Sequence, residues 1–251
     1  MRRAATLPAV DAPCAWHRDG SLTWLAARLP GAHAAFSTRA GGVSEGPFES
    51  LNLGILTDDD RGRVQRNRAT LAGALARDAG SIVMGHQVHG ADVQVRERAG
   101  GGLARVDAQV TASADLTPLV LVADCVPLVI AAPGAVAAVH CGWRGLAGGI
   151  VRAATATVRE LGGKPLAAAV GPGIGPCCYE VGPEVLERFG AAGPTLDLPA
   201  LVAAELGAAG LADDSVAVAG LCVSCHPELF FSHRRDGGIT GRLAGLAWLA
   251  S

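Results

Sequence analysis

Two apolar runs that are separated by only two residues constrain the fold of this chain more than any other feature. They are VPLVIAA at 126–132 and AVAAVHC at 135–141, separated by Pro133 and Gly134. Proline and glycine end a strand and reverse the chain, which is typical of a β-hairpin. We therefore predict two neighbouring antiparallel strands, joined by a loop of either four residues, 131–134, or two.

Other apolar runs alternate with helix-like segments. Further strands are expected at 32–36, 81–85, 92–96, 118–124, 165–171 and 215–221, and helices at 61–80, 144–163 and 240–250. Groups of strands with helices between them indicate an α/β or α+β sandwich. With 50% hydrophobic residues and neither a repeat nor a long linker, 1–251 is expected to form a single domain around one large core. Residues 1–30 are a less certain N-terminal extension of it.

The charge balance argues against nucleic acid as a partner. Lys and Arg number 21 against 23 Asp and Glu, which leaves no basic surface for a phosphate backbone. The N-terminal apolar stretch is too short for a signal peptide, and no segment reaches the roughly 18 uncharged apolar residues of a membrane span. We expect a cytoplasmic protein that binds neither nucleic acid nor a membrane.

Two chemically active side chains lie at the same end of the predicted hairpin. Cys125 precedes its first run, and His140 is near the end of its second. The four-residue loop would set them directly opposite, with Cβ atoms about 4.5 to 5.5 Å apart, and the two-residue loop would make them diagonal neighbours on one face. Such a pair suits a shared metal ion, a nucleophile with its base, or mere core packing. The best source of a third metal ligand is GHQVHGADV, which contains His86 and His89.

A set of motifs in a fixed order resembles one known family. The motifs are STRAGGVSEGPFESLNLG, NRATL, HQVHGADV, ADCVPL, VHCGWRG, VGPGIGPCCYEVG and FFSHRRDGGITGRLAGLAWL, from about residue 36 to the C-terminus. They resemble the YfiH-like laccase-domain family, also called the multicopper polyphenol oxidase or purine nucleoside phosphorylase family. The resemblance implies a layered α/β/β/α sandwich, similar in layering to cysteine hydrolases, and a metal site, usually zinc, formed by His89, Cys125 and His140. One departure is ILTDDD at 55–60, where relatives tend to carry HVGDD, which puts contacts near Asp58 in doubt.

The resemblance also implies a function. It predicts phosphorolysis of adenosine, inosine and methylthioadenosine, together with deamination of adenosine, with nucleoside and phosphate as the small-molecule partners. Zinc supports deamination by acidifying water. Phosphorolysis needs an anion site, for which Arg39, Arg144 and the pair Arg234 and Arg235 are candidates. Arg144 is favoured because it follows the strand of His140 at the start of a predicted helix.

Three alternatives compete with this interpretation. A cysteine hydrolase would use Cys125 as nucleophile and His140 as base on amide bonds, such as those of cell-wall precursors. Copper-dependent polyphenol oxidation, a laccase activity, ranks lower because the chain has 7 histidines and no His-x-His pair, whereas several coppers need many grouped imidazoles. A binding module without enzymatic activity is the third.

Four further cysteines have no assigned role. Cys222 and Cys225 belong to CVSCH, which fits a haem-attachment pattern, but no export signal supports that interpretation. With Cys177 and Cys178 they could form a structural zinc site, although an adjacent pair has poor ligand spacing. A redox pair or simple structural thiols are the remaining options, and the sequence leaves these options and the oligomeric state open.

Overall fold

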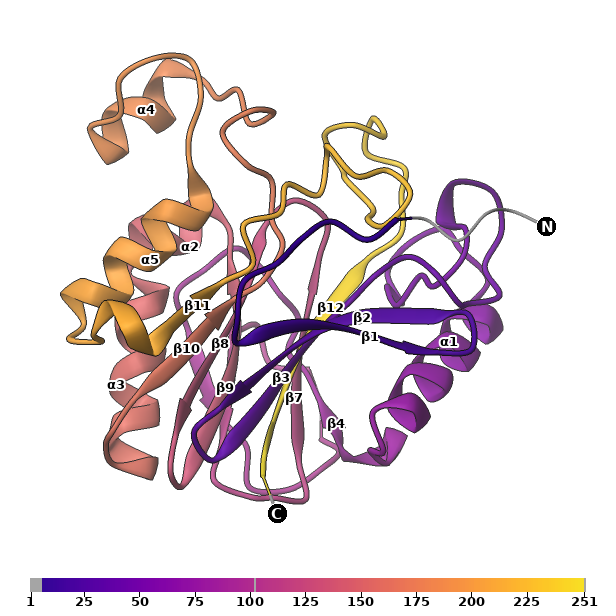
Figure 1. Cartoon of the computed structure of the whole chain (residues 1–251), viewed down its shortest axis with the longest axis horizontal. Helices are drawn as coiled ribbons and strands as arrows, with labels where there is room; N and C mark the ends of the chain where they lie inside the picture. Colours follow the sequence, from indigo (N-terminus) through magenta and orange to yellow (C-terminus); the bar gives the residue numbers. More distant parts are fainter. Residues whose placement is uncertain (1–5, 102, 251) are drawn as a thin grey trace.

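The computed structural model describes residues 6–101 and 103–250, whose strands form two six-stranded sheets (Figure 1). The first sheet contains, in spatial order, β1 (Cys14–Asp19), β2 (Leu22–Leu29), β3 (Ala32–Ser37), β12 (Leu243–Leu249), β7 (Thr117–Val122) and β4 (Ile82–Val83). The second contains β11 (Val216–Val218), β10 (Ala167–Val170), β8 (Val126–Ala132), β9 (Ala135–Cys141), β6 (Ala108–Thr111) and β5 (Val93–Val95). Both sheets mix parallel and antiparallel pairs.

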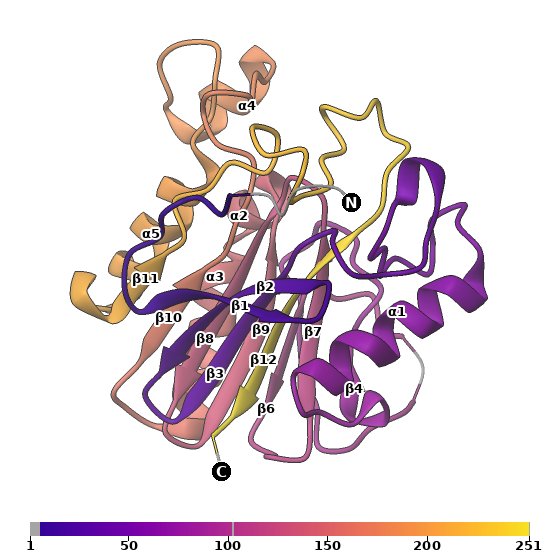
Figure 2. The ribbon, with the colours of Figure 1, turned by 45° about the vertical axis from the view of Figure 1, so that its right-hand side comes forward.

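Helices cover the outer faces of the two sheets (Figures 1 and 2). They are α1 (Arg61–Ala74) on the first sheet and α2 (Trp143–Gly148), α3 (Ile150–Gly162) and α5 (Leu198–Ala208) on the second, whereas α4 (Pro183–Phe189) lies beyond the ends of the strands (Figures 1 and 2). Short 3-10 turns lie at Gly46–Phe48, Ala79–Ser81 and Asp213–Ser215. Helix α1 packs Leu71 against the first sheet, while α3 and α5 pack Val158 and Val202 against the second. The expected α/β/β/α layering is therefore confirmed.

Small side chains fill the layer between the sheets. The first sheet contributes Ala34 and Ala247, and the second contributes Ala131, Ala138 and Ala169, all at most 1% exposed. Because alanine extends only one carbon from the backbone, the two sheets approach closely. The high alanine content, which blurs helix and strand patterns in the sequence, thus has a packing role here.

The central hairpin is formed by β8 and β9, and its register selects the shorter loop. Val126 pairs with Cys141 and Ala132 pairs with Ala135, so only Pro133 and Gly134 form the turn. Pro127 therefore lies opposite His140, and Cys125, just before the strand, is its diagonal neighbour. The two-residue alternative is correct, and both side chains are at the edge opposite the turn.

The C-terminal segment corrects one prediction. Residues 240–250 are not a helix: β12 lies in the middle of the first sheet, between β3 and β7. Leucines at 243, 246 and 249 imitate helical spacing, but Gly245 and the neighbouring alanines fit a strand packed closely on both faces. A Cβ on Gly245 would lie only 2.6 Å from Cβ of Pro127 in the opposing sheet, so glycine is required for the sheets to meet.

Other differences concern boundaries and missed elements. The helix expected over 144–163 is two helices, because Gly149 adopts a left-handed φ of 85° between α2 and α3. Residues 14–29, expected within an uncertain extension, form β1 and β2. The sequence patterns also gave no indication of β6, α4 or α5. Across 6–101 and 103–250, none of the helices is both long and apolar enough to cross a membrane.

Candidate functional site

Three side chains from separate parts of the chain meet at the edge where β8 begins and β9 ends. The ligand atoms of His89, Cys125 and His140, here named the His–Cys cluster, all lie within 4.8 Å of one another. The two imidazole rings are 4.9 Å apart between centroids and inclined by 76°. His140 is buried, Cys125 half-buried and His89 exposed, so the cluster opens to solvent on one side. His86 is exposed and stands outside the cluster.

One buried carboxylate, Asp107, orients both histidines of the cluster. Its Oδ1 lies 2.7 Å from Nδ1 of His140, which leaves Nε2 of that ring for the cluster. The same carboxylate accepts backbone N–H bonds from Val88, His89 and Gly90 at 3.0, 2.9 and 2.8 Å. Burial raises the pKa of Asp107, but these hydrogen bonds outweigh it and lower the pKa overall.

The loop that carries His89 is also fixed to the first sheet. The Gln87 side chain donates to the carbonyl of Leu121 and accepts from its amide, both at 2.7 Å, and so pairs with β7 as a backbone would. His89 itself adopts a left-handed φ of 60°, which costs a residue other than glycine about 1 to 3 kcal/mol. The Gln87 and Asp107 contacts hold it there.

Asp124, directly before Cys125, is held in the same way. Its φ is 94°, again in the region that favours glycine. The buried carboxylate accepts the Ser232 hydroxyl at 2.6 Å and the Arg234 amide at 2.7 Å. The connection from β7 to β8 spans only residues 123–125 and passes from the first sheet to the second. Cys125 is thus placed by a short, strained link between the two sheets.

The charges in the cluster favour a thiolate and an imidazolium. Burial alone raises the pKa of Cys125, but the charge and hydrogen bond of His140 outweigh it and lower the pKa to about 6. Burial likewise lowers the pKa of His140, whereas Cys125 and Asp107 together raise it to about 9. The thiolate is the form in which cysteine binds metals or acts as a nucleophile, and His140 releases its Nε2 proton when a metal ion binds there.

The donor set and the space around it fit a metal ion. Two imidazole nitrogens and one thiolate form a three-ligand set that zinc accepts with a fourth position left open. Gly142, which follows β9, leaves room beside these side chains: a Cβ there would lie 3.1 Å from both Cys125 Sγ and His89 Cδ2. Any side chain at 142 would therefore crowd the cluster.

The candidate arginines fall into two groups. Arg39 donates to the carbonyls of Glu49 and Pro227 at 2.7 and 3.0 Å, so its guanidinium joins two loops. Arg235 forms a two-pronged ion pair with Asp236 at 2.7 and 2.9 Å and also donates to nearby carbonyls. These two side chains have structural partners.

Arg144 and Arg234 flank Tyr179 at the rim of the cluster, and Arg234 also donates to the Glu180 carbonyl at 2.7 Å. Arg144 is exposed at the start of α2, with its Cζ 4.2 Å from the Trp143 ring, and Arg234 lies 5.4 Å over the Tyr179 ring. Burial and the nearby Cys125 raise the pKa of Tyr179 to about 12, against the opposing effect of the two arginines. Tyr179 therefore keeps its proton at neutral pH and can donate a hydrogen bond.

The sequence patterns did not single out Asp107, Gln87 or Tyr179. An acidic residue inside the apolar stretch VDAQV was a visible signal for Asp107. Gln87 lies within the HQVHG motif, but its contact with a strand 34 residues away is visible only in the fold. Tyr179 gave no signal beyond its place after the cysteine pair.

A second group of ligating atoms lies in two neighbouring loops. The thiols of Cys177, Cys178, Cys222 and Cys225, here named the four-cysteine cluster, are all within 4.8 Å of one another and could bind a metal ion. The adjacent pair, whose spacing counted against this site, joins it nevertheless.

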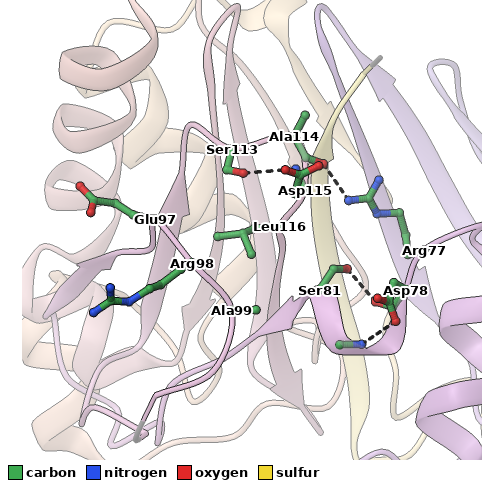
Figure 3. Close-up of a pocket in the computed structure, with 11 residues that line it drawn as sticks. Arg77, Asp78, Ser81, Glu97, Arg98, Ala99, Ser113, Ala114, Asp115 and Leu116 are labelled. Carbon is green, nitrogen blue, oxygen red and sulfur yellow. Dashed lines mark hydrogen bonds between the residues drawn. The ribbon is translucent and has the colours of Figure 1, made fainter.

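A cavity of about 560 Å³ is lined by none of the residues of either cluster (Figure 3). It opens beside the start of β7, whereas Asp124 and Cys125 follow the end of the same strand. Its polar lining includes Arg77, Asp78, Glu97, Arg98 and Asp115. Arg77 donates to the Ala114 carbonyl in a neighbouring loop, and Asp78 accepts from the Gly80 amide in its own loop. This cavity has no part in the geometry of the His–Cys cluster.

Comparisons with known proteins place the chain in a family. The sequence model of the multi-copper polyphenol oxidoreductase laccase family matches residues 33–250, and the chain belongs to that family. The expected family resemblance is thus confirmed.

Particular relatives narrow the comparison. Purine nucleoside phosphorylase YlmD of Geobacillus stearothermophilus is 38% identical over 88% of this chain and 92% of its own. Purine nucleoside phosphorylase SCO2081 of Streptomyces coelicolor is 42% identical over 87% and 96%. The crystal structure of YlmD matches with a TM-score of 0.87 at 35% identity, covering 95% of this chain and 100% of that one. The Bacillus licheniformis hypothetical protein YfiH matches with a TM-score of 0.85 at 30% identity, covering 94% and 99%.

Proposed function

We propose that this protein is a zinc-dependent purine nucleoside phosphorylase acting on adenosine, inosine and methylthioadenosine, and that the same site deaminates adenosine. The observation that carries the proposal is the His–Cys cluster, open on one side and flanked by Arg144. The names of the relatives support nucleoside and phosphate as substrates. His89, Cys125 and His140 would hold the zinc, which supplies Lewis-acid chemistry, including the acidified water that deamination requires.

The residues around the cluster have roles that follow from their contacts. Asp107 holds a proton on Nδ1 of His140, so that Nε2 stays directed at the cluster. Arg144 has no hydrogen-bond partner within 6–101 and 103–250, so its donors are free to bind phosphate as a two-pronged fork. Arg39, the other anion-binding candidate, donates instead to the Glu49 and Pro227 carbonyls and would support the surrounding loops.

Phosphorolysis requires charge to be neutralised at two places. A phosphate oxygen forms a bond to C1′ of the ribose while the C1′–N9 bond breaks and its electron pair leaves with the purine. Arg144 and Arg234 would neutralise the attacking anion. Tyr179, protonated at neutral pH, would donate a hydrogen bond to an oxygen or nitrogen of the bound substrate.

The direct test separates the two reactions by their need for phosphate. Purified protein is incubated with adenosine, inosine and methylthioadenosine, with and without phosphate, and the products are separated by chromatography. Only with phosphate do we expect free base together with the sugar 1-phosphate, which is ribose 1-phosphate from adenosine and inosine and methylthioribose 1-phosphate from methylthioadenosine. We expect inosine from adenosine in either case. Failure of all three nucleosides to react in zinc-loaded protein would refute the proposal.

A cysteine hydrolase is the second candidate, and one observation favours it. Asp107, His140 and Cys125 are arranged as orienting acid, base and nucleophile, and the pKa of Cys125 is lowered to about 6. That scheme gives His89 no role, although a strained backbone holds it in the cluster. Hydrolysis of amide substrates by metal-stripped protein would favour this second candidate.

A further inference from the structure

The four-cysteine cluster draws sulfur atoms from two loops that follow neighbouring parallel strands. Cys177 and Cys178 lie in the loop after β10, and Cys222 and Cys225 lie in the loop after β11. The Cys225 sulfur is 3.5 Å from the sulfurs of both Cys177 and Cys178. All four are free thiols. Their convergence from segments more than 40 residues apart requires the fold to bring them together.

The spacing of the sulfurs matches a shared ion better than a disulfide. Zinc–sulfur bonds of about 2.3 Å in a tetrahedron place the sulfurs about 3.8 Å apart. The closest sulfur pairs here are 3.5 Å apart, and all pairs are within 4.8 Å. A disulfide needs about 2.05 Å, so any bond would pull one pair out of the group.

The backbone around the sulfurs supports a thiolate site. The Gly175 amide donates to Cys222 Sγ at 3.2 Å, a contact that stabilises a negatively charged sulfur. Gly173 forms a parallel bridge with Cys222, and the Val223 amide donates to the Gly173 carbonyl at 3.0 Å. The two loops are thus already aligned by backbone bonds. Cys177 and Cys225 are exposed, which gives an ion a path of entry.

We propose that Cys177, Cys178, Cys222 and Cys225 bind one Zn²⁺ in a structural site with four thiolate ligands, separate from the His–Cys cluster. Four thiolates in tetrahedral reach of one another select zinc or iron, and a closed set of four cysteines is the usual form of structural zinc. The inference does not depend on nucleoside chemistry.

The position of the site gives it a second consequence. Tyr179 directly follows Cys178, and Arg235 donates to the Val223 carbonyl between the other two cysteines. The ion would therefore fix one wall of the rim that faces Cys125. Loss of the ion should loosen Tyr179 without removing any ligand of the His–Cys cluster.

Metal analysis of the full-length protein tests the proposal. We expect two zinc ions per wild-type chain and one in a Cys222→Ser/Cys225→Ser variant. Ser224→Ala, which changes the residue between them and no sulfur, is the matched control and should keep two. Cobalt-substituted wild-type protein should give much more intense thiolate-to-metal absorption than the cobalt-substituted double variant, which keeps only the single thiolate of Cys125 as a metal ligand.

A measurement on wild-type protein covers the case in which the double variant fails to fold. Native protein is alkylated with its zinc bound and after a chelator has removed the zinc, and the modified cysteines are located by mass spectrometry. We expect zinc to protect Cys177, Cys178, Cys222 and Cys225 together. Equal alkylation in both samples, iron in place of zinc, or a Cys222–Cys225 disulfide in the protein purified without reductant would each overturn the proposal.

Discussion

At the scale of single residues, the Asp107 carboxylate accepts hydrogen bonds from His140 and from the loop that carries His89. An Asp107→Asn variant replaces one acceptor oxygen by an NH₂ group, which only donates. The single remaining oxygen cannot accept both the His140 ring N–H and three backbone amides. We expect zinc affinity at the His–Cys cluster to fall about 10- to 100-fold, because residues that orient metal ligands have effects of this size. Competition against a chelator of known affinity measures the change.

The control for this substitution is Asp115→Asn. Asp115 is exposed and lies at the start of β7, away from the cluster, so the same chemical change there should leave zinc affinity as in the wild type. Equal affinity in the Asp107→Asn variant and the wild type would show that His140 needs no orienting acid.

Arg144 provides a test of anion binding. Arg144→Lys keeps the positive charge but loses the planar fork, so we expect the KM for phosphate to rise roughly tenfold, the size of effect that one lost charge-assisted hydrogen bond produces. Steady-state kinetics at low phosphate, with circular dichroism to check the fold, measures this. Unchanged kinetics would make Arg144 an ordinary surface charge stacked on Trp143.

Cys125 decides between a ligand and a nucleophile. If it is a ligand, Cys125→Ser and His140→Ala should each lose one zinc ion and more than about 99% of activity, and a chelator should silence the wild type reversibly. Full activity of metal-stripped protein, with a covalent adduct trapped on Cys125, would instead establish the hydrolase scheme.

At the scale of elements, prediction from sequence succeeded where one pattern excluded others. The Pro133–Gly134 turn between two uniformly apolar runs allowed only a hairpin, and the observed register followed one of its two loops. The prediction for the C-terminal segment was wrong because the leucines of LAGLAWL recur every three residues, as in a helix, while the same segment also fits a strand. Only its place between β3 and β7 decides the matter.

The candidate site was predictable to a similar extent. The meeting of His89, Cys125 and His140 could be predicted, because the family motifs contain all three residues and the hairpin places two of them. Asp107 and Gln87 act through contacts with backbone groups 17 to 34 residues away. Such contacts leave no spacing in the sequence, so they appear only with the fold.

The place of Gly245 in β12 leads to a prediction of stability. Gly245→Ala puts a methyl group 2.6 Å from Pro127 Cβ, and we expect this overpacking to lower the free energy of unfolding by about 1 to 3 kcal/mol. Gly73→Ala is the opposite control, because Gly73 is exposed in α1 with free space around it, and alanine should raise the same quantity by about 0.5 to 1 kcal/mol. Urea unfolding of both variants measures the difference.

At the scale of the whole molecule, metal content separates the chemistry proposed here from that in the family's laccase name. We expect zinc at the His–Cys cluster and no set of several coppers, because 7 histidines cannot supply the imidazoles that several coppers need. Elemental analysis of protein purified without chelator checks this. Several coppers per chain with turnover of phenols would contradict it.

That residues 1–251 form a single domain stays a prediction.

The alanine layer between the sheets has a mechanical consequence for the reaction. Residues 123–125 form a three-residue linker that joins one sheet to the other and ends at Cys125. If a larger side chain at Ala138 or Ala169 shifted one sheet relative to the other, this linker would shift too and would move the Cys125 thiol. Turnover would then fall well before the chain lost its fold, although no reacting group had been touched.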